Sequence, residues 1–486
     1  MQDYGIHWFR RDLRLFGNTA LDLQIKKFDG RVLGFFCFDK SFLSRDDFSV
    51  NRFQFFLETL AKLRETMRER GGDLLVMDVG PEVAFKQLFS TMDSAGISLP
   101  TLITWNRDYE PFAVARDTKM RKFFDDTKIE HKDFRDHLII EPHELEKAAN
   151  EGYQVYSPFA KKWLKIIQED AFSERIKEAA NSLSNSYRPT VRFNIDWSQV
   201  FKGNPVPEDH LDSYRADNIK SVTVDIPKPG FEAALEQLGR FKSVLSDYQT
   251  GRDFPAIDGT SRMSHYLKNG TVTTAQVIAF LNLKPYVKKQ DSFDNYYSEL
   301  IWREFYIHIL SRHPRVEKEA FLVKYKKIAW VDRPDWLEAW KKGMTGYPIV
   351  DAGMRELLAT GHMHNRVRMI VSSFLTKDLL INWQEGERYF MKELLDGDVA
   401  ANNGGWQWAA STGCDPQPYF RIFNPWLQSK KFDADGAYIK TYIPELKNVP
   451  AKNLHAPIVG HDSYPEPIVD HKERRELALK AYKAAR

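Results

Sequence analysis

The segment 396–408 holds polar and aromatic side chains at a density that core packing explains poorly. Its sequence, DGDVAANNGGWQW, combines two carboxylates, amides, glycines and two indoles, and it lacks the apolar stripe of a core helix. Carboxylates and amides can hydrogen-bond a polar ligand, indoles can stack on a planar one, and glycines let a backbone approach a ligand closely. The segment therefore predicts a ligand site.

Two further sets of residues have the i, i+3, i+4 spacing that places side chains on one face of a helix. The sets are Asn365, Arg368 and Met369, and Glu299, Trp302 and Arg303. Either face could be the wall of a ligand site, since Glu can accept from a base edge, Trp can stack on it and Arg can bind phosphate. An ordinary Glu–Arg pair with a packing Trp, or a solvated Arg beside a buried Met, explains each set equally well.

A weaker signal lies at 259–264, where GTSRMS precedes a helical stretch. Glycine, hydroxyls and an arginine near a helix start can form an anion cradle, although an ordinary N-cap has the same composition. The chain has no Gly-x-x-x-x-Gly-Lys-Ser/Thr loop, no Gly-x-Gly-x-x-Gly after the first strand and no His-Glu-x-x-His. A kinase, a standard dinucleotide domain and a zinc protease are therefore disfavoured.

Residues 1–140 alternate short apolar runs with amphipathic stretches. The run 31–38 is almost continuously apolar, which is typical of a strand buried on both faces. We expect strands at 4–9, 31–38, 73–77, 102–105 and 131–140, and helices at 51–70, 81–95 and 111–126. This alternation predicts a Rossmann-like α/β domain with a parallel sheet and helices on both faces.

The second half of the chain has a different periodicity. Prolines interrupt any long helix between 182 and 230, so we expect residues 141–230 to be an inter-domain linker with some helix. Helical periodicity dominates 231–486, with examples at 299–312, 351–360, 365–380 and 387–395. The prediction is an α/β domain, a long linker and a larger all-α domain.

The bulk composition limits the class of protein. The 486 residues suggest two domains, and no apolar run approaches the ~20 residues of a membrane span. Only Cys37 and Cys414 are present and the first residues do not resemble a secretory signal, so we expect a cytoplasmic protein. A net charge of +3 leaves room for a basic face that binds nucleic acid.

Motifs along nearly the whole chain resemble one family, the DNA photolyases of the photolyase/cryptochrome family. They include 8–14 (WFRRDLR), 363–366 (MHNR), 383–387 (WQEGE), 402–408 (NNGGWQW) and 468–473 (IVDHKE). The closest likeness is to bacterial class I enzymes that act on cyclobutane pyrimidine dimers. The resemblance implies an antenna-type α/β domain, an FAD-binding helical domain and light-dependent repair of UV-damaged DNA, with no membrane and no obligate protein partner. We expect a monomer.

The resemblance also implies roles for individual residues around FAD, which would be active in its reduced form, FADH⁻. The matching phosphate-side positions are Tyr248, Thr260, Ser261, Arg262, Met263 and Ser264. The positions matching the ring and ribose side are Arg303, Asn365, Arg368, Asp396, Asp398 and Asn402, with Arg368 paired to Asp396 and Asn402 facing flavin N5.

Electron transfer and substrate binding are implied at further positions. Trp406, Trp383 and Trp330 match a chain that carries electrons from the surface to the flavin. The positions that match the substrate face are Glu299, Trp302, Arg303, Asn365, Met369 and Trp408. The lesion would flip out of the duplex into this cavity, where Glu299 would steady its developing charge.

The antenna pigment stays open at this point. Glu110 matches a position that contacts a folate antenna in some relatives, whereas others bind a deazaflavin or a second flavin. Gly17, where such enzymes often have Asp, adds to the ambiguity. Methenyltetrahydrofolate, deazaflavin and FMN are therefore all candidates.

Several other functions compete with dimer repair. A cryptochrome-type blue-light receptor is the main alternative, but Asn402 stands where plant cryptochromes carry Asp, and no signalling tail follows the shared region. A (6-4) photolyase would have His at Asn365. An adenylating enzyme lacks support from nucleotide motifs, and a plain DNA-binding protein leaves the segment 402–408 unexplained.

Overall fold

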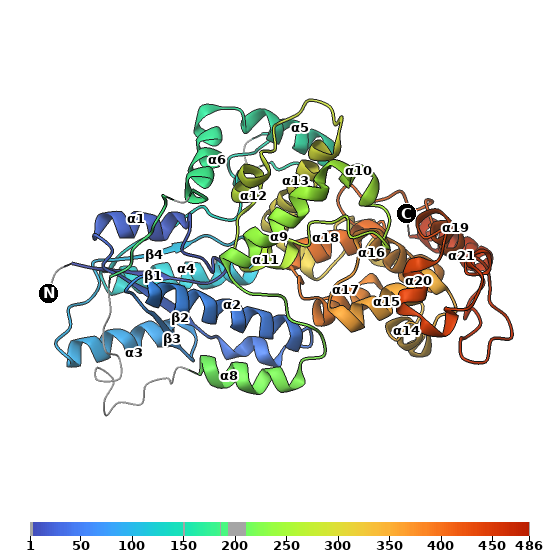
Figure 1. Cartoon of the computed structure of the whole chain (residues 1–486), viewed down its shortest axis with the longest axis horizontal. Helices are drawn as coiled ribbons and strands as arrows, with labels where there is room; N and C mark the ends of the chain where they lie inside the picture. Colours follow the sequence, from blue (N-terminus) through green and yellow to red (C-terminus); the bar gives the residue numbers. More distant parts are fainter. Residues whose placement is uncertain (1–2, 149–150, 185, 193–209, 486) are drawn as a thin grey trace.

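The computed structural model describes residues 3–148, 151–184, 186–192 and 210–485, and it has an α/β part and a larger helical part (Figure 1). A parallel sheet with strand order β3-β2-β1-β4-β5 forms the centre of the α/β part. The strands are β1 (Gly5–Trp8), β2 (Val32–Cys37), β3 (Leu74–Met77), β4 (Leu102–Asn106) and β5 (Glu130–Phe134). The predicted fold class is confirmed.

Helices cover both faces of this sheet. The helices are α1 (Thr19–Lys27) and α2 (Val50–Glu69) on one face, and α3 (Pro81–Ser94) and α4 (Pro111–Asp126) on the other. Ile6 and Trp8 of β1 pack toward α3 and α4, whereas Val32 and Val76 pack toward α1 and α2. Because both faces are covered, the strands need apolar residues at successive positions, as the sequence of 31–38 has.

The last strand is shorter than the predicted 131–140. After Phe134 the chain leaves the sheet and turns to the helical part, where a buried carboxylate captures it. The backbone N–H of Ile139 donates to Glu304 Oε1 at 2.6 Å, and Trp163 Nε1 donates to Glu304 Oε2 at 2.7 Å. The apolar residues 138–140 therefore belong to the helical core, which a strand-like pattern alone does not reveal.

Helices make up the remaining described chain. They are α5 (Tyr156–Ile166), α6 (Asp170–Ser182), α8 (Leu211–Asn218), α9 (Phe231–Val244), α10 (Tyr248–Gly251), α11 (Ser264–Asn269), α12 (Thr274–Leu281), α13 (Ser292–Arg312), α14 (Pro334–Lys341), α15 (Pro348–Thr360), α16 (Asn365–Ser373), α17 (Trp383–Glu393), α18 (Val399–Ala409), α19 (Pro425–Phe432), α20 (Ala437–Tyr442) and α21 (His471–Ala484). None of them is long and apolar enough to cross a membrane.

The segment predicted as a linker packs against both parts. Helices α5 and α6 lie against α13 and α12 of the helical part, whereas α8 lies against α2 of the α/β part. Arg215 of α8 pairs with Glu58 of α2 at 2.7 Å. Residues 193–209 of the predicted linker 141–230 lie outside the described residues.

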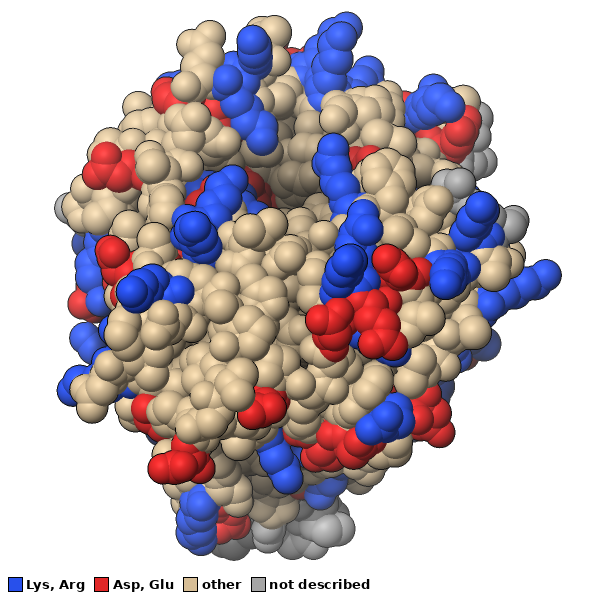
Figure 2. Space-filling model, turned by 90° about the vertical axis from the view of Figure 1, so that its right-hand side faces the viewer, with Lys and Arg blue, Asp and Glu red and all other residues tan. Residues whose placement is uncertain are grey.

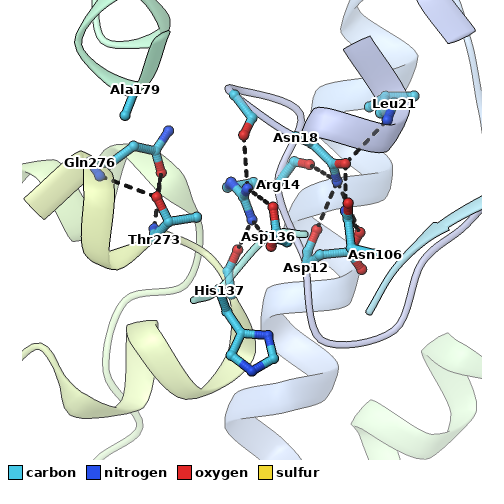
Figure 3. A network of polar contacts seen from close by, with 12 residues as sticks. Asp12, Arg14, Asn18, Leu21, Asn106, Asp136, His137, Ala179, Thr273 and Gln276 are labelled. Carbon is cyan, nitrogen blue, oxygen red and sulfur yellow. Dashed lines mark hydrogen bonds and ion pairs between the residues drawn. The ribbon is translucent and has the colours of Figure 1, made fainter. Parts of the chain in front are cut away.

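A buried polar network joins the two parts at the loop after β1 (Figure 3). Arg14 is 1% exposed and pairs with Asp136, with Nη1 and Oδ2 3.0 Å apart. The same guanidinium donates to the carbonyl oxygens of Phe16, Gly17 and Gly270 at 3.1, 2.8 and 2.9 Å. The bond to Gly270 crosses to the helical part, so this ion pair fixes how the two parts meet.

We predict that Asp136→Ala destabilises the protein strongly, because it leaves the Arg14 charge buried without its partner. Breaking a buried ion pair in this way costs about 3–5 kcal/mol of unfolding free energy. Denaturant unfolding measures this loss. Glu319→Ala, which removes the half-exposed partner of Arg315, serves as the control and should leave stability nearly unchanged.

Candidate cofactor and substrate site

Residues 399–408 of the segment 396–408 lie in helix α18, and Asp398 caps the first turn of that helix. The carboxylate accepts from the backbone N–H of Ala401 at 3.1 Å. The sequence suggested that glycines here let the backbone approach a ligand closely, but Gly404 has a different role. A Cβ there would lie 2.1 Å from Cδ1 of Tyr306, so this glycine makes room for a neighbouring ring, whereas Gly405 faces open space.

An ion pair between α16 and the start of this segment forms the polar centre of the site. Arg368 Nη2 lies 3.0 Å from Asp396 Oδ2, and Arg368 Nε donates to the carbonyl of Met363 at 2.8 Å. Burial by itself raises the pKa of Asp396, but Arg368, His362 and a hydrogen bond from Ser264 outweigh it and hold the pKa at about 2. Asp396 is therefore a permanent anion.

The segment 259–264 lies beside this pair through its last residue, Ser264, which begins α11. Gly259 packs tightly on Gly251, with a Cβ at Gly259 3.2 Å from the Gly251 carbonyl carbon. Met263 is buried, whereas Arg262 is exposed and pairs with Asp258 at 3.0 Å. Thr260 and Ser261 remain half-buried, so the segment offers hydroxyls to a neighbouring ligand.

A tyrosine and a histidine, Tyr248 and His265, complete this region. Tyr248 is buried and makes edge contacts with Phe241 and Tyr296, with ring centroids 5.6 and 5.3 Å apart. The Nε2 atom of His265 is buried and has no hydrogen-bond partner within the described part of the chain. A buried polar atom of this kind is suited to bind a polar group of a ligand or a water. No motif in the sequence pointed to His265.

Three of the residues predicted for the substrate face come from α13 and differ in placement. Glu299 pairs with Arg252 at 2.6 Å, and Trp302 stacks on Tyr156 with centroids 3.6 Å apart. Arg303 turns instead to the interface between the two parts, where it donates to the carbonyls of His137 and Leu267 at 3.2 and 3.4 Å. This placement does not favour the predicted contact of Arg303 with DNA.

The remaining substrate-face residues lie at the surface of the helical part. Asn365 is exposed at the start of α16, and Met369 and Trp408 are half-buried. Arg366, which the sequence analysis did not select, pairs with Asp253 at 2.5 Å. Figure 2 shows the right-hand side of the molecule in Figure 1, with a hollow that has Lys and Arg side chains at parts of its rim.

The three tryptophans of the predicted electron chain share one apolar cluster. Trp406 and Trp383 are buried in it, and Trp330 packs at its margin. Gly386 lets Trp406 approach α17, because a Cβ there would lie 2.1 Å from the indole. Trp340, which the sequence analysis did not single out, lies 6.0 Å from Trp406 between ring centroids.

A buried acid supports the amide of Asn402. Asn402 Nδ2 donates to the backbone carbonyl of Glu387 at 2.9 Å, and Asn403 Nδ2 donates to Glu387 Oε1 at 2.8 Å. Burial raises the pKa of Glu387 to about 8, so this carboxyl is largely neutral at pH 7. The neutral carboxyl therefore holds Asn403, and the backbone carbonyl of the same residue holds Asn402, without adding a charge beside the site.

A separate cavity of about 300 Å³ opens where the carboxyl ends of β1 and β2 meet the helical part. Its apolar wall is formed mainly by phenylalanines, namely Phe36, Phe38, Phe42, Phe48, Phe53, Phe56 and Phe112. Its charged lining residues are Arg10, Arg11, Arg52, Arg116 and Lys268, with Asp39, Asp108 and Glu110. Cations outnumber carboxylates, so the cavity suits a planar ligand that carries negative charge.

Comparison with known proteins agrees with this architecture. A family model for DNA photolyase matches residues 5–179, and a model for the FAD binding domain of DNA photolyase matches residues 296–484. A deoxyribodipyrimidine photo-lyase of Escherichia coli (strain K12) is 38% identical over 99% of this chain and 98% of its own length. One of Halobacterium salinarum is 36% identical over 99% of both chains.

Solved structures give the same result. A class III photolyase from Agrobacterium tumefaciens superposes with a TM-score of 0.83 at 32% identity, covering 100% of this chain and 98% of that one. A photolyase from Sulfolobus tokodaii with two FAD molecules gives 0.80 at 31% identity and 99% coverage of both. The fold and site are those of a two-domain flavoprotein. The chain belongs to the DNA photolyase family, and it is a photolyase that uses FAD.

The residues present fit FAD. The Arg368–Asp396 pair, the hydroxyls of 260–264 and the unpartnered His265 Nε2 surround one region between α10, α11, α16 and α18. Arginine and the hydroxyls suit the phosphates and polar ring atoms, whereas the Asp396 carboxylate can accept from a ring N–H. FAD, when bound, supplies the light-absorbing electron carrier of this site.

We predict that Arg368→Leu weakens FAD binding by at least about tenfold, because it leaves Asp396 charged and unpaired. Loss of one partner of such a pair costs on the order of 2–5 kcal/mol. Equilibrium dialysis of FAD measures the effect. Arg388→Leu removes an exposed partner of Glu385 instead and is the matched control. Equal FAD affinity in both variants would contradict the assigned role.

Proposed function

We propose that this protein repairs cyclobutane pyrimidine dimers in DNA under blue or near-UV light. The observation that carries the proposal is the composition of α18 and its cap. Asp398 and Asn402 lie on the flavin side, Trp406 in the apolar cluster and Trp408 near the surface, all within one short helix. Cofactor, electron chain and substrate face would therefore meet there.

The substrate would be a dimer flipped out of the duplex into the hollow of the helical part. Flipping is less costly for a damaged base pair, because stacking and pairing are already weakened. Trp302 and Trp408 offer indole faces for the fused bases, and Asn365 and Met369 border the same surface. Lys and Arg side chains around the hollow would bind phosphates, so affinity would fall with salt.

Reduced FAD would supply an excited electron to the dimer, which splits and returns it. The protein's part is to position the lesion and to stabilise charge. Glu299 is held by Arg252 at the edge of the surface, and its carboxyl can hydrogen-bond the lesion. Asn402 would present an uncharged amide to the flavin, and the backbone carbonyl of Glu387 holds its Nδ2 in place.

Electrons that restore the reduced flavin would pass through Trp330, Trp383 and Trp406. Indoles are oxidisable, and the buried cluster around Trp406 and Trp383 excludes water from the path.

Both cysteines, Cys37 and Cys414, are free thiols, which is consistent with the inferred reducing cytosol.

A light-dependence assay tests the proposed repair. The FAD-loaded, reduced protein should remove dimers from an oligonucleotide in light and not in the dark. Glu299→Ala should lower the yield by about fivefold, the equivalent of one hydrogen bond of about 1 kcal/mol, with FAD content unchanged. Glu385→Ala on the exposed side of α17 is the control. No loss of dimers in light would favour a light receptor without repair.

We also propose that the cavity at the ends of β1 and β2 holds the antenna chromophore, as a tricyclic flavin or deazaflavin. The wall of phenylalanines matches a rigid planar ring, and Arg11, Arg52 and Lys268 offer charge to its polar end. The Sulfolobus tokodaii photolyase contains two FAD molecules, which supports a second flavin-type ligand in this family. Glu110 lines this cavity, as the sequence suggested for an antenna contact.

The pH dependence of antenna binding follows from two buried groups. Burial lowers the pKa of Lys268 to about 8, with Arg52 and Arg11 adding to the effect, and burial raises the pKa of Glu110 to about 7. Lowering the pH from about 9 to about 7 therefore charges Lys268 and neutralises about half of Glu110. Both changes favour an anion, so FMN binding to the FAD-loaded protein should tighten by about tenfold.

Fluorescence titration with FMN at each pH measures this change. Lys268→Met should remove the larger part of the pH dependence, because the Lys268 titration is nearly complete in that range and only about half of the Glu110 titration remains. Equal pH dependence in this variant and the parent protein would exclude Lys268 as its source.

A further inference from the structure

Arg11 belongs to both ligand sites. Its side chain lines the antenna cavity, where Nη1 lies 2.6 Å from Glu110 Oε1. Nη2 of the same guanidinium is bonded to Asp398, the cap of α18, which lies two residues after Asp396 of the proposed flavin region. Nε donates to the carbonyl of Lys268 at 2.9 Å. One planar group thus spans the wall between the cavity and the flavin region.

Helix α11 makes the same connection through the backbone. Its first residue, Ser264, hydrogen-bonds Asp396 and helps lower its pKa on the flavin side. Its last two residues, Lys268 and Asn269, line the antenna cavity. The helix is only six residues long, so a displacement at either end reaches the other. Arg11 binds the carbonyl at its cavity end and is therefore placed to hold the helix still.

The carboxyl partners of Arg11 differ in how fully they are charged at neutral pH. Asp398 is a firm anion, because Arg11, Arg303 and the N–H of Ala401 outweigh the effect of burial and lower its pKa. Glu110 has a pKa near 7, so at neutral pH it holds Arg11 only part of the time. Asp108 also lines the cavity and is a permanent anion with a pKa of about 2, but its Oδ1 lies 3.7 Å from Arg11 Nη1, beyond hydrogen-bond distance. Among the described residues on the cavity side, the guanidinium therefore has no permanent anion in direct contact, although the cavity has a surplus of cations.

We propose that occupancy of the antenna cavity strengthens FAD binding through Arg11, an inference that rests on the proposed antenna role of the cavity. A chromophore anion would give the guanidinium a permanent partner on its cavity side. Arg11 would then stay ordered on Asp398 and on α11, and FAD would bind to a site whose ordering had already occurred. By linkage, bound FAD would strengthen chromophore binding by the same factor.

The test measures release of radiolabelled FAD from the holoenzyme into excess unlabelled FAD, with and without saturating FMN. FMN should slow release by about fivefold or more in the parent protein, within the usual range for coupled sites. Arg11→Gln and Arg11→Lys should reduce the slowing to below about twofold. Lysine keeps the charge and preserves the fold better than glutamine, but its single nitrogen cannot reproduce the planar fork whose three nitrogens reach Lys268, Glu110 and Asp398.

Arg116→Gln is the matched control. Arg116 also lines the cavity, but its ion pair is with Asp117 on the α/β side, 2.9 Å away. This variant should need more FMN for saturation and should then show the full slowing. Equal slowing in the Arg11 and Arg116 variants would overturn the role of Arg11.

Two outcomes separate this proposal from the antenna role itself. If FMN binds the parent protein but leaves FAD release unchanged, the coupling is wrong and the antenna role stands. If neither FMN nor 8-hydroxy-5-deazariboflavin binds, both are wrong.

Discussion

The buried ion pair between Arg14 and Asp136 is the interaction on which the joining of the two parts depends. Its guanidinium has four different acceptors, three of them carbonyl oxygens, and one of these lies on Gly270 of the helical part. A buried charge is tolerated only when its hydrogen bonds are complete, so the loop after β1 and the turn after α11 must keep one relative position. Gly270 has a positive φ of 65°, and a Cβ there would lie 2.0 Å from the Arg11 carbonyl oxygen.

This constraint places two ligand regions close to each other. Arg10 and Arg11 of this loop line the proposed antenna cavity, and the turn that the loop binds ends the helix that begins with Ser264 beside Asp396. Energy transfer between two chromophores requires a fixed distance and orientation. A polar junction supplies that fixity better than apolar packing, because its hydrogen bonds are directional.

The acidic side chains of the flavin region differ in charge, and the charged and neutral ones have different roles. Asp396 and Asp398 remain anionic because arginines outweigh their burial, whereas Glu387 stays largely neutral because its burial outweighs Asn403 and Arg388. The carboxylates can bind polar groups of FAD. The neutral carboxyl of Glu387 instead accepts from Asn403, and the backbone carbonyl of the same residue holds Asn402, so no charge is added beside these amides.

The sequence by itself determined the class of the fold and the location of the main site. Apolar periodicity is a local property, so the first four strands and the helices α2, α3 and α4 could be predicted within a few residues. The polar string 396–408 could be recognised because no core pattern explains it. The tertiary structure alone decided which side chains meet. Gly404 admits Tyr306, Arg303 turns to the interface, 138–140 leave the sheet, and Arg11 reaches Asp398, 387 residues away. These are contacts between distant segments, and no local spacing encodes them.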